Sequence, residues 1–311
     1  MIRHGHEDLV RPSRVVVLGA SGFVGADVVR ELTALDIPTL GVTSAEIDLC
    51  QADAVDALRR LVRSDDVLVI TSALTPDRGK DVGTFMKNIA MGAHLSAFLQ
   101  QTVCAQVVYI SSDAVYPEAT SLIRETSPCQ PGSFHGLMHL VRERLLAQAL
   151  ATAGTPLLIL RPCPLYGPGD PHQSYGPNRF LRAARTQGTI TLIGEGEEQR
   201  DHVYLKDLSR LVAQGVLWRS AGILNVATGT SWSFSRLASL IANVCDEPVQ
   251  ITSTPRTAPA THRFVTISAC LKAFPAFRYT PLPRGLAETM RDVELGMAEA
   301  SRGGERKGMS R

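Results

Sequence analysis

One short segment near the N-terminus constrains the fold of this chain more than any other. An apolar run at 15–18 (Val-Val-Val-Leu) is followed at once by Gly19-Ala-Ser-Gly22-Phe-Val-Gly25, and a helical pattern then covers 26–35. A continuous β-branched run predicts a strand buried on both faces, as in a parallel sheet. Three glycines between such a strand and a helix predict a turn whose backbone closely approaches a ligand. An ordinary tight turn is the alternative interpretation.

The turn has the properties that the pyrophosphate of a dinucleotide requires. Its backbone N–H groups can approach phosphate oxygens, and the helix N-terminus adds about half a positive charge. Gly22 leaves room for this approach, and Gly25 lets the helix pack closely on the strand. We expect cofactor contacts from this turn and from the segments after the second and third strands: Gly19, Ser21, Gly22, Phe23, Val24, Gly25, Asp48, Leu49, Thr71, Ser72 and Ala73.

The choice between NAD and NADP depends on the end of the second expected strand. An Asp or Glu there usually accepts a hydrogen bond from the ribose 2′-hydroxyl of NAD, whereas an Arg favours NADP. The segment Gly41-Val-Thr43-Ser44 supplies neither, and Asp48 lies further along, where it is expected to meet the adenine. The cofactor is therefore expected to be NAD or NADP, with NAD mildly preferred.

Strand and helix patterns alternate along most of the chain. Strands are expected at 15–18, 39–42, 67–70, 107–111, 157–160 and 222–228, and helices at 26–35, 54–62, 85–100, 137–153, 207–216 and 232–245. Such alternation predicts a Rossmann-type, doubly wound parallel sheet of the α/β class. From Pro162 onward, a stretch rich in Pro and Gly marks a change of structure.

These patterns predict two domains and two tails. The dinucleotide-binding domain is expected to cover 14–165, with a later return of the chain at about 200–228. A smaller substrate-binding domain is expected at 166–199 and 229–296. Residues 1–13 and 297–311 are expected to be flexible.

Composition excludes several classes of protein. The 32 basic and 30 acidic residues give no global charge for binding nucleic acid or an anionic membrane. The six cysteines are scattered, which predicts reduced thiols and no metal site. No stretch approaches about 18 apolar residues and the first residues lack an apolar leader core. A cytoplasmic location is therefore expected.

Six segments in order carry a resemblance to a known family. They are Gly19-Ala-Ser-Gly-Phe-Val-Gly25, Ser111-Ser-Asp-Ala-Val-Tyr116, Arg161-Pro162 with Tyr166-Gly-Pro-Gly169, Gly194-Glu-Gly196, Arg200-Asp-His-Val-Tyr-Leu-Lys-Asp207 and Asn225-Val-Ala-Thr-Gly229. Over roughly 14–296 the chain resembles the extended short-chain dehydrogenase/reductases, the NAD-dependent epimerase/dehydratases of nucleotide sugars. The resemblance implies that Ser112 hydrogen-bonds the sugar, that a Tyr transfers a proton and that a Lys four residues later holds the cofactor ribose.

In this chain, histidines occupy the positions where the resemblance implies the Tyr and the Lys: His135 replaces the Tyr and His139 replaces the Lys. A neutral imidazole can accept a proton near pH 6.5 without a neighbouring ammonium, so His135 is a candidate acid/base. It is shorter than a phenol, and an error of about 1 Å can cost roughly a hundredfold in rate. His139 can hydrogen-bond a ribose hydroxyl but carries no permanent charge. A shared metal ion and an ordinary, partly buried helix position are the alternatives for this pair.

Four residues are candidates for contacts with the substrate: Ser112, Asp113, Asn178 and Arg200. The resemblance assigns Arg200 to the nucleotide diphosphate, and a planar guanidinium suits paired phosphate oxygens. A surface ion pair with Glu198 or Asp201 is the alternative for Arg200, and a loop-solvating role is the alternative for Asn178. Related dehydratases have an Asp-Glu pair here, but Ala114 follows Asp113. Dehydration is therefore disfavoured.

Taken together, the resemblance predicts an NAD(P)-dependent oxidoreductase that epimerises a nucleotide sugar through a keto intermediate. Ile47-Asp48-Leu49 is similar to the dTDP-4-dehydrorhamnose reductase branch, so a ketoreductase is a second hypothesis. A catalytically silent, cofactor-binding scaffold is a third, because function resides in the site and not in the fold. The resemblance also implies a homodimer formed through the two long helices at 85–100 and 137–153.

Overall fold

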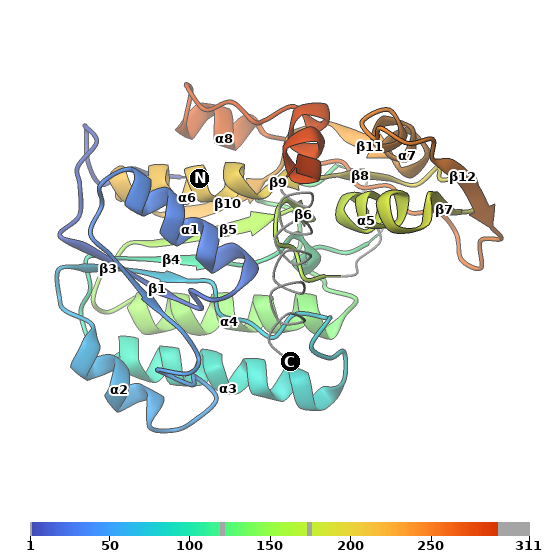
Figure 1. Cartoon of the computed structure of the whole chain (residues 1–311). Helices are drawn as coiled ribbons and strands as arrows, with labels where there is room; N and C mark the ends of the chain where they lie inside the picture. Colours follow the sequence, from blue (N-terminus) through green and yellow to red (C-terminus); the bar gives the residue numbers. More distant parts are fainter. Residues whose placement is uncertain (1, 119–121, 173–175, 292–311) are drawn as a thin grey trace, which may run out of the picture.

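A six-stranded parallel sheet forms the centre of the molecule, and its strand order is β10-β5-β4-β3-β1-β2 (Figure 1). The computed structural model describes residues 2–118, 122–172 and 176–291. The strands are β1 (Arg14–Leu18), β2 (Thr39–Val42), β3 (Asp66–Ile70), β4 (Gln106–Ile110), β5 (Leu157–Pro162) and β10 (Gly222–Val226). The expected doubly wound α/β fold is therefore confirmed, including the late strand that joins the sheet beside β5.

Helices cover both faces of this sheet. In Figure 1, α1 (Phe23–Ala34) and α6 (Leu205–Leu217) lie above it, and α2 (Ala54–Leu61), α3 (Val82–Leu99) and α4 (Phe134–Leu150) lie below. The apolar run of β1 contributes side chains to the cores on both faces of the sheet, because alternate side chains of a strand point to opposite faces. Val15 and Val17 belong to the core under α1 and α6, whereas Val16 and Leu18 belong to the core over α2, α3 and α4.

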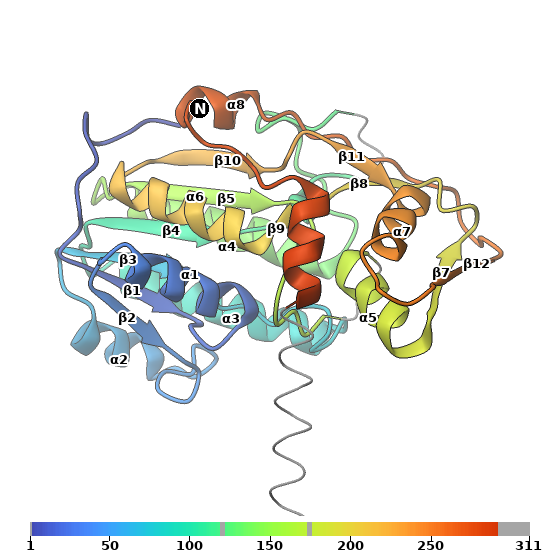
Figure 2. The same ribbon diagram turned by 45° about the horizontal axis from the view of Figure 1, so that its top comes forward.

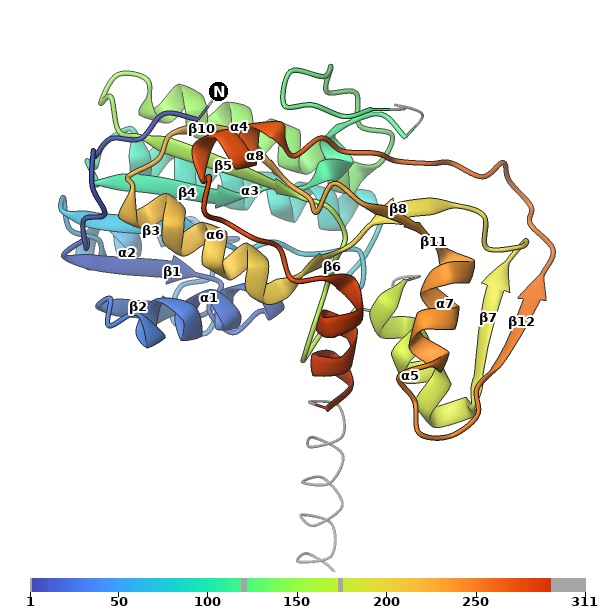
Figure 3. The same cartoon turned by 90° about the horizontal axis from the view of Figure 1, so that it is seen from above.

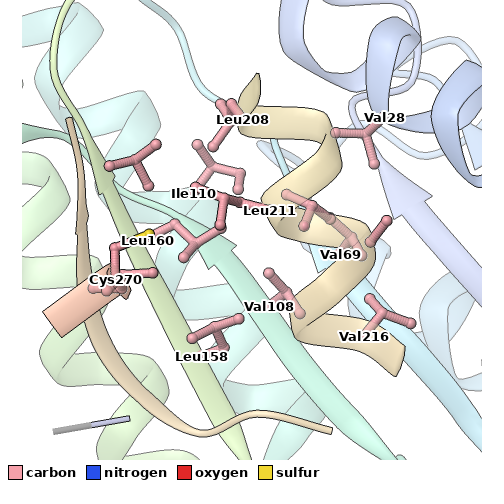
Figure 4. Packing of buried hydrophobic residues seen from close by; sticks show 14 of the residues in the cluster. Val28, Val69, Val108, Ile110, Leu158, Leu160, Leu208, Leu211, Val216 and Cys270 are labelled. Carbon is pink, nitrogen blue, oxygen red and sulfur yellow. The ribbon is translucent and has the colours of Figure 1, made fainter. Parts of the chain in front are cut away.

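Helix α6 holds the returning chain against the sheet. Figure 4 shows its Leu208 and Leu211 facing Val108 and Ile110 of β4 and Leu160 of β5. Burying an aliphatic side chain of this size stabilises the folded state by about 1.5–3 kcal/mol. This packing explains why the chain returns to the central sheet between two parts of the smaller group of elements.

A smaller group of elements lies to one side of the sheet (Figures 2 and 3). It contains α5 (Pro177–Gln187), β7 (Thr189–Ile193), β8 (Gln199–Asp201), β11 (Ser231–Ser233), α7 (Phe234–Ala242) and β12 (Gln250–Thr254). Strands β7 and β12 pair in parallel, whereas β8 and β11 pair antiparallel. Phe180, Ile190, Phe234 and Leu237 are buried in its separate core. The two-residue strands β6 (Leu165–Tyr166) and β9 (Val203–Tyr204) connect this group to the sheet.

Two long helices begin earlier than the apolar pattern predicts. Helix α3 starts at Val82 because the carboxylate of Asp81 accepts a hydrogen bond from the backbone N–H of Thr84. Helix α4 starts at Phe134 because the hydroxyl of Ser133 accepts one from the N–H of Gly136. Both are N-cap interactions, which set a helix start independently of hydrophobic periodicity.

The two ends of the chain differ from each other. The N-terminal segment, for which a flexible tail was expected, pairs Arg3 with Ala221, and the ring nitrogens of His4 lie 2.9 Å from Ser220 Oγ and 2.9 Å from the carbonyl oxygen of Ala273. Met1 and the expected tail at 297–311 lie outside the described residues. Among the helices that are described, none has the length and apolar character needed to span a bilayer.

Candidate active site

A cleft of about 400 Å³ opens at the carboxyl ends of β1, β2 and β3. The eleven residues expected to contact the cofactor from the glycine-rich turn and the next two strand ends all line it: Gly19, Ser21, Gly22, Phe23, Val24, Gly25, Asp48, Leu49, Thr71, Ser72 and Ala73. His139, the twelfth expected contact, is not among the lining residues in the described part of the chain. The parallel topology brings these separate segments to one edge of the sheet.

Two of the glycines are required by close packing. Gly19 has φ +90°, and a Cβ atom there would lie 2.8 Å from the backbone nitrogen of Ser72. A Cβ atom at Gly25 would lie 2.1 Å from the carbonyl oxygen of Gly19. The hydroxyl of Thr71 donates to the carbonyl oxygen of Leu18 at 2.8 Å and so ties β3 to the end of β1. The turn is therefore compressed between α1 and β3, and any larger side chain would displace it.

The N-terminus of α1 fits an anionic group. Its N-cap residue is Gly22, and no side chain of the described residues caps this end. The first N–H groups of a helix have no partner within the helix, and here they adjoin the cleft at Phe23, Val24 and Gly25. Unpaired N–H groups and the helix dipole together bind phosphate. The cleft therefore fits the pyrophosphate of a dinucleotide.

The cleft continues past the end of β2, where Thr43, Ser44 and Asp48 line it. The carboxylate of Asp48 accepts hydrogen bonds from the backbone N–H of Cys50 at 2.9 Å and from Gln51 Nε2 at 3.2 Å. The hydrogen bond from Cys50 is the main reason that the pKa of Asp48 is lowered. This end of the cleft therefore presents hydroxyl groups and one negative charge.

His172 closes another side of the cleft, and sequence reasoning missed it. Its Nδ1 lies 2.5 Å from Asp170 Oδ1, and its Nε2 lies 3.1 Å from Thr75 Oγ1 and 3.2 Å from Asp77 Oδ1. The hydrogen bond with Asp170 is the main reason that the pKa of His172 is raised. The loop at 170–172 is thereby joined to the loop after β3. No sequence pattern indicates this contact, because nearly a hundred residues separate the two loops.

His135 lines a second cavity, of about 320 Å³, at the N-terminal ends of α3 and α4. Its neighbours there include Phe85, Phe134 and Met138. Burial in this apolar setting lowers the pKa of His135 to about 4, with a smaller contribution from the charge of His172. The imidazole is therefore neutral at physiological pH, as a proton acceptor must be.

His139 lies deeper on the same helix. Only 4% of its surface is exposed, and its ring stands 4.7 Å from that of His135 at 87°. Its Nδ1 lies 2.7 Å from the hydroxyl of Tyr109 on β4, a residue that the sequence analysis did not single out. Burial, followed by the effects of His135 and Arg142, holds the pKa of His139 well below its usual value. Both histidines are therefore neutral.

A short turn after β4 brings Ser112 towards this helix. The hydroxyl of Ser112 accepts a hydrogen bond from the N–H of Ala114 at 3.1 Å and caps the 3₁₀ turn η1 (Asp113–Val115). A Cβ atom at Gly136 would lie 2.0 Å from the carbonyl oxygen of Ala114. Glycine at 136 therefore allows the turn to lie directly against the helix, one residue from His135.

A buried ion pair joins the same helix to the central sheet. Arg161 on β5 donates to Glu143 on α4 through Nε at 2.9 Å and Nη2 at 2.6 Å, and Ser111 donates to Glu143 at 2.5 Å. Arg161 also donates to the hydroxyl of Tyr116 at 2.8 Å. Every charge in this network has a partner, so it fixes α4 against the sheet.

Asp113 and Arg200 are both engaged with other side chains. The Nε of Arg263 lies 3.5 Å from Asp113 Oδ2, and burial raises the pKa of this carboxyl group. Arg200 forms an ion pair with Glu198 and donates to Thr261 Oγ1 at 2.7 Å. The alternative interpretation of Arg200, an ion pair with Glu198, is therefore what the structure contains. Arg263 was not predicted.

Asn178 is held by the loop that precedes it. Its side-chain oxygen accepts from the N–H of Gly167 at 3.1 Å, and its nitrogen donates to the carbonyl oxygen of Gly167 at 2.7 Å. In this structure the amide side chain therefore bonds to the backbone of the loop at Gly167. The described residues contain no cluster of three side chains able to hold a metal ion.

Comparison with known proteins agrees with this arrangement. Residues 15–227, more than half of the chain, match the NAD dependent epimerase/dehydratase family. The chain belongs to this family. The epimerase/dehydratase resemblance found in the sequence is thus confirmed, whereas the histidines at 135 and 139 remain a departure from the pattern that the resemblance implies.

Solved structures share the fold of this epimerase/dehydratase at low sequence identity. The UDP-glucose 4-epimerase of Thermus thermophilus in complex with NAD is 22% identical, with a TM-score of 0.78 over 90% of this chain and 98% of that one. MoeE5 in complex with UDP-glucose and NAD is also 22% identical, with a TM-score of 0.76 over 91% and 99%. A GDP-L-fucose synthetase of Naegleria fowleri bound to NADP is 15% identical, with a TM-score of 0.82 over 95% and 98%.

Proposed function

We propose that this epimerase/dehydratase-family protein binds NAD or NADP in the cleft and epimerises a nucleotide sugar through a keto intermediate. One observation carries the proposal: three strand ends far apart in sequence supply a single cleft that fits a dinucleotide, beside a turn and a helix that bear Ser112 and His135. The complexes of similar folds with NAD, NADP and UDP-glucose support it. We prefer NAD, because the described residues that line the cleft directly after β2 include Ser44 and Asp48 but no Lys or Arg; Arg78, which also lines it, follows β3.

Each residue has a defined part in this proposal. A bound nicotinamide ring would take hydride from the sugar carbon and return it to the opposite face. The neutral imidazole of His135 would accept the hydroxyl proton while the ketone forms and would give it back when the hydroxyl is restored. Ser112 would hydrogen-bond the reacting oxygen, and His139 would contact the ribose. Arg200, beside Glu198, would bind the diphosphate.

The proposal also covers the domains, the oligomeric state and the cellular location of the protein. Residues 14–165 with a return at about 200–228 would form the dinucleotide-binding domain, and 166–199 and 229–296 the substrate-binding domain. Leu140, Val141 and Leu145 line a hollow on the outer side of α4, which supports a homodimer through α3 and α4. Neither the overall charge nor any described helix points to nucleic acid or a membrane as a partner, and we propose a cytoplasmic location.

Two other functions remain candidates. A ketoreductase is favoured by Ile47, Asp48 and Leu49, which resemble a segment of the reductase branch in sequence and all line the cleft. A silent cofactor-binding scaffold is favoured by the histidines, which leave the described part of the site without a lysine at position 139. The reactions differ in their use of cofactor: epimerisation regenerates it, whereas reduction consumes NADH or NADPH.

One experiment with a panel of nucleotide sugars and coenzymes distinguishes these three functions. Purified protein is incubated with UDP-, GDP- and dTDP-sugars and with each nicotinamide coenzyme, and both sugar configuration and coenzyme redox state are followed by NMR. Interconversion of two sugars without net oxidation or reduction of coenzyme supports the epimerase. Net coenzyme oxidation with a keto sugar identifies a reductase. Tight coenzyme binding without turnover of any sugar identifies a scaffold.

A further inference from the structure

His139 and Tyr109 form a buried pair that joins α4 to β4. Tyr109 is 1% exposed and His139 is 4% exposed. The phenolic oxygen lies 2.7 Å from His139 Nδ1, which is a short hydrogen bond, and the two ring centres are 5.9 Å apart. The imidazole is thus held at one nitrogen by a neighbour from a different element. That hydrogen bond decides which nitrogen carries the proton.

The direction of this hydrogen bond follows from the surroundings. Burial raises the pKa of Tyr109 to about 12, so the phenol keeps its proton. His139 Nδ1 is the only hydrogen-bond partner of this hydroxyl among the residues that the structure describes. Donation in the opposite sense would leave the phenolic proton buried without an acceptor, at a cost of about 1–3 kcal/mol. Tyr109 therefore donates, and the proton of the neutral imidazole lies on Nε2.

Burial, followed by the effects of His135 and of the cation of Arg142, lowers the pKa of His139 and keeps the imidazole neutral. The guanidinium carbon of Arg142 lies 5.2 Å from the centre of the Tyr109 ring, and Arg142 is fully buried. None of its three nitrogens has a hydrogen-bond partner within the described residues. A Cβ atom at Gly92 would lie 2.7 Å from Arg142 Cγ, so the glycine of α3 makes room for this side chain. A second positive charge on His139, between Arg142 and His135, would be repelled.

We propose that Tyr109 is a positioning residue that holds His139 in the neutral tautomer with its proton on Nε2. His139 then offers a permanent N–H donor to a ribose hydroxyl of the cofactor, in place of a charged ammonium. The tautomer follows from Tyr109 and α4 alone, whereas the ribose contact rests on the proposed function. The two parts are therefore tested separately.

The first test is made on the full chain without cofactor or sugar. Imidazole ¹⁵N shifts are recorded from pH 5.5 to 8, with His139 assigned by the signals lost in His139→Gln. We expect Nδ1 to be unprotonated and Nε2 protonated throughout, and Tyr109→Phe to move His139 towards a mixture of tautomers. A proton on Nδ1 in the unmodified chain, or an unchanged spectrum in Tyr109→Phe, overturns the proposal. Tyr279→Phe, which removes a buried hydroxyl near Cys270, is the matched control and should leave His139 unchanged.

The second test measures coenzyme affinity by calorimetry. A Gln at 139 retains an N–H donor near the place of Nε2, whereas a Leu does not. We expect His139→Gln to bind NAD within about twofold of the unmodified chain and His139→Leu to bind about three- to tenfold more weakly. Equal affinity of the two variants, with the tautomer confirmed, rejects the ribose contact alone. Absence of coenzyme binding by the unmodified chain rejects the proposed function and leaves the tautomer result standing.

Discussion

The cofactor cleft and the N-terminal end of α4 shift the pKa of a histidine in opposite directions. In the cleft, His172 lies between Asp170 and Asp77, and its pKa is raised. On α4, His135 lies among apolar side chains and has a pKa of about 4. Carboxylates stabilise the imidazolium, whereas burial removes the water that would solvate it. The same residue type is therefore more readily protonated on one side of the site and less readily protonated on the other.

This contrast explains why the two regions suit different tasks. The cleft combines backbone N–H groups, glycines and short polar side chains, which suit a phosphate, with apolar side chains such as Ile47 and Leu49. The cavity at the end of α4 is lined by aromatic and aliphatic side chains and also by polar ones such as Asn88, and burial there keeps a base uncharged and ready to accept a proton. The variants below break or sharpen this division, beginning with the largest expected effect.

Removing the neutral base should have the largest effect. We expect His135→Ala to lower kcat by about a hundredfold to ten-thousandfold, because general-base catalysis contributes that much. His135→Tyr, which restores the residue implied by the family resemblance, should retain more activity than His135→Ala. The measurement is steady-state turnover of whichever sugar the panel identifies. His6→Ala, in the N-terminal segment, is the control, and equal rates for it and His135→Ala would exclude His135 as the base.

Filling the tight turn should have the next largest effect. A methyl group at Gly25 would overlap the carbonyl oxygen of Gly19, so Gly25→Ala should cost about 1–3 kcal/mol of stability and displace the phosphate turn. Calorimetric titration with NAD should show weaker binding at a temperature where the variant is folded. Gly132→Ala is the control, because its nearest neighbour would be 3.8 Å away. Unchanged NAD affinity in Gly25→Ala would place the pyrophosphate elsewhere.

Acid should unfold the protein through its buried histidines. The folded pKa of His202 is about 3 and that of His139 is well below 6.5, because both are buried. Below pH 6.5 the unfolded chain binds protons that the folded chain does not, so this stability is present above pH 6.5 and is lost as pH falls. The loss by pH 5.5 should be about 1.4 kcal/mol for His202, and His139 should add a loss in the same direction. Urea denaturation at several pH values measures it.

Two variants separate the contributions to that pH profile. His202→Leu should flatten the acid side, and an unchanged slope would show that His202 is protonated in the folded state. His172 has the opposite sign: its raised pKa gives stability that is present below pH 6.5 and is lost as pH rises through the folded value. His172→Gln should therefore remove the fall in stability as pH rises above 6.5 and lower the stability below pH 6.5, while the slope of the acid side stays the same.

Removing the guanidinium of Arg142, which has no hydrogen-bond partner among the described residues, should have the smallest effect on the free energy of unfolding. Replacing a buried ion pair with apolar side chains of similar volume is often neutral or stabilising, and a buried charge without an ion-pair partner has less attraction to lose. Arg142→Met should therefore change the free energy of unfolding by less than about 1 kcal/mol. Arg161→Met is the matched contrast, because it leaves Glu143 buried without its partner and should cost about 3–5 kcal/mol. Similar losses in both variants would show that Arg142 has a partner in solution.

Local patterns predicted the central sheet well and the smaller group of elements poorly. Most strands of the sheet contain an apolar run of three or more residues, which is recognised without knowing its neighbours. Strand β11 and helix α7 were merged into one expected helix at 232–245, because three residues of strand leave no periodic signal. Ser233, whose hydroxyl accepts a hydrogen bond from Arg236 N–H, marks the true start of α7. Caps of this kind are the local signal that periodicity overlooked.

The candidate site likewise contains residues that local patterns predicted and residues that only the structure revealed. The glycine spacing at 19, 22 and 25 and the order of strands led to eleven residues that line one cleft. Tyr109 sits within an apolar strand and His172 within a loop rich in proline and glycine, so nothing local distinguishes either residue. Their roles arise from partners 30 and 97 residues away in sequence.

The sequence by itself determined the parallel sheet, the phosphate turn and the family, because each depends on backbone geometry and on residues that are neighbours in the chain. Only the tertiary structure decided the protonation of the histidines. Whether an imidazole is charged depends on the water and the charges around it, and folding alone brings Tyr109 and Arg142 to His139, and Asp77 to His172.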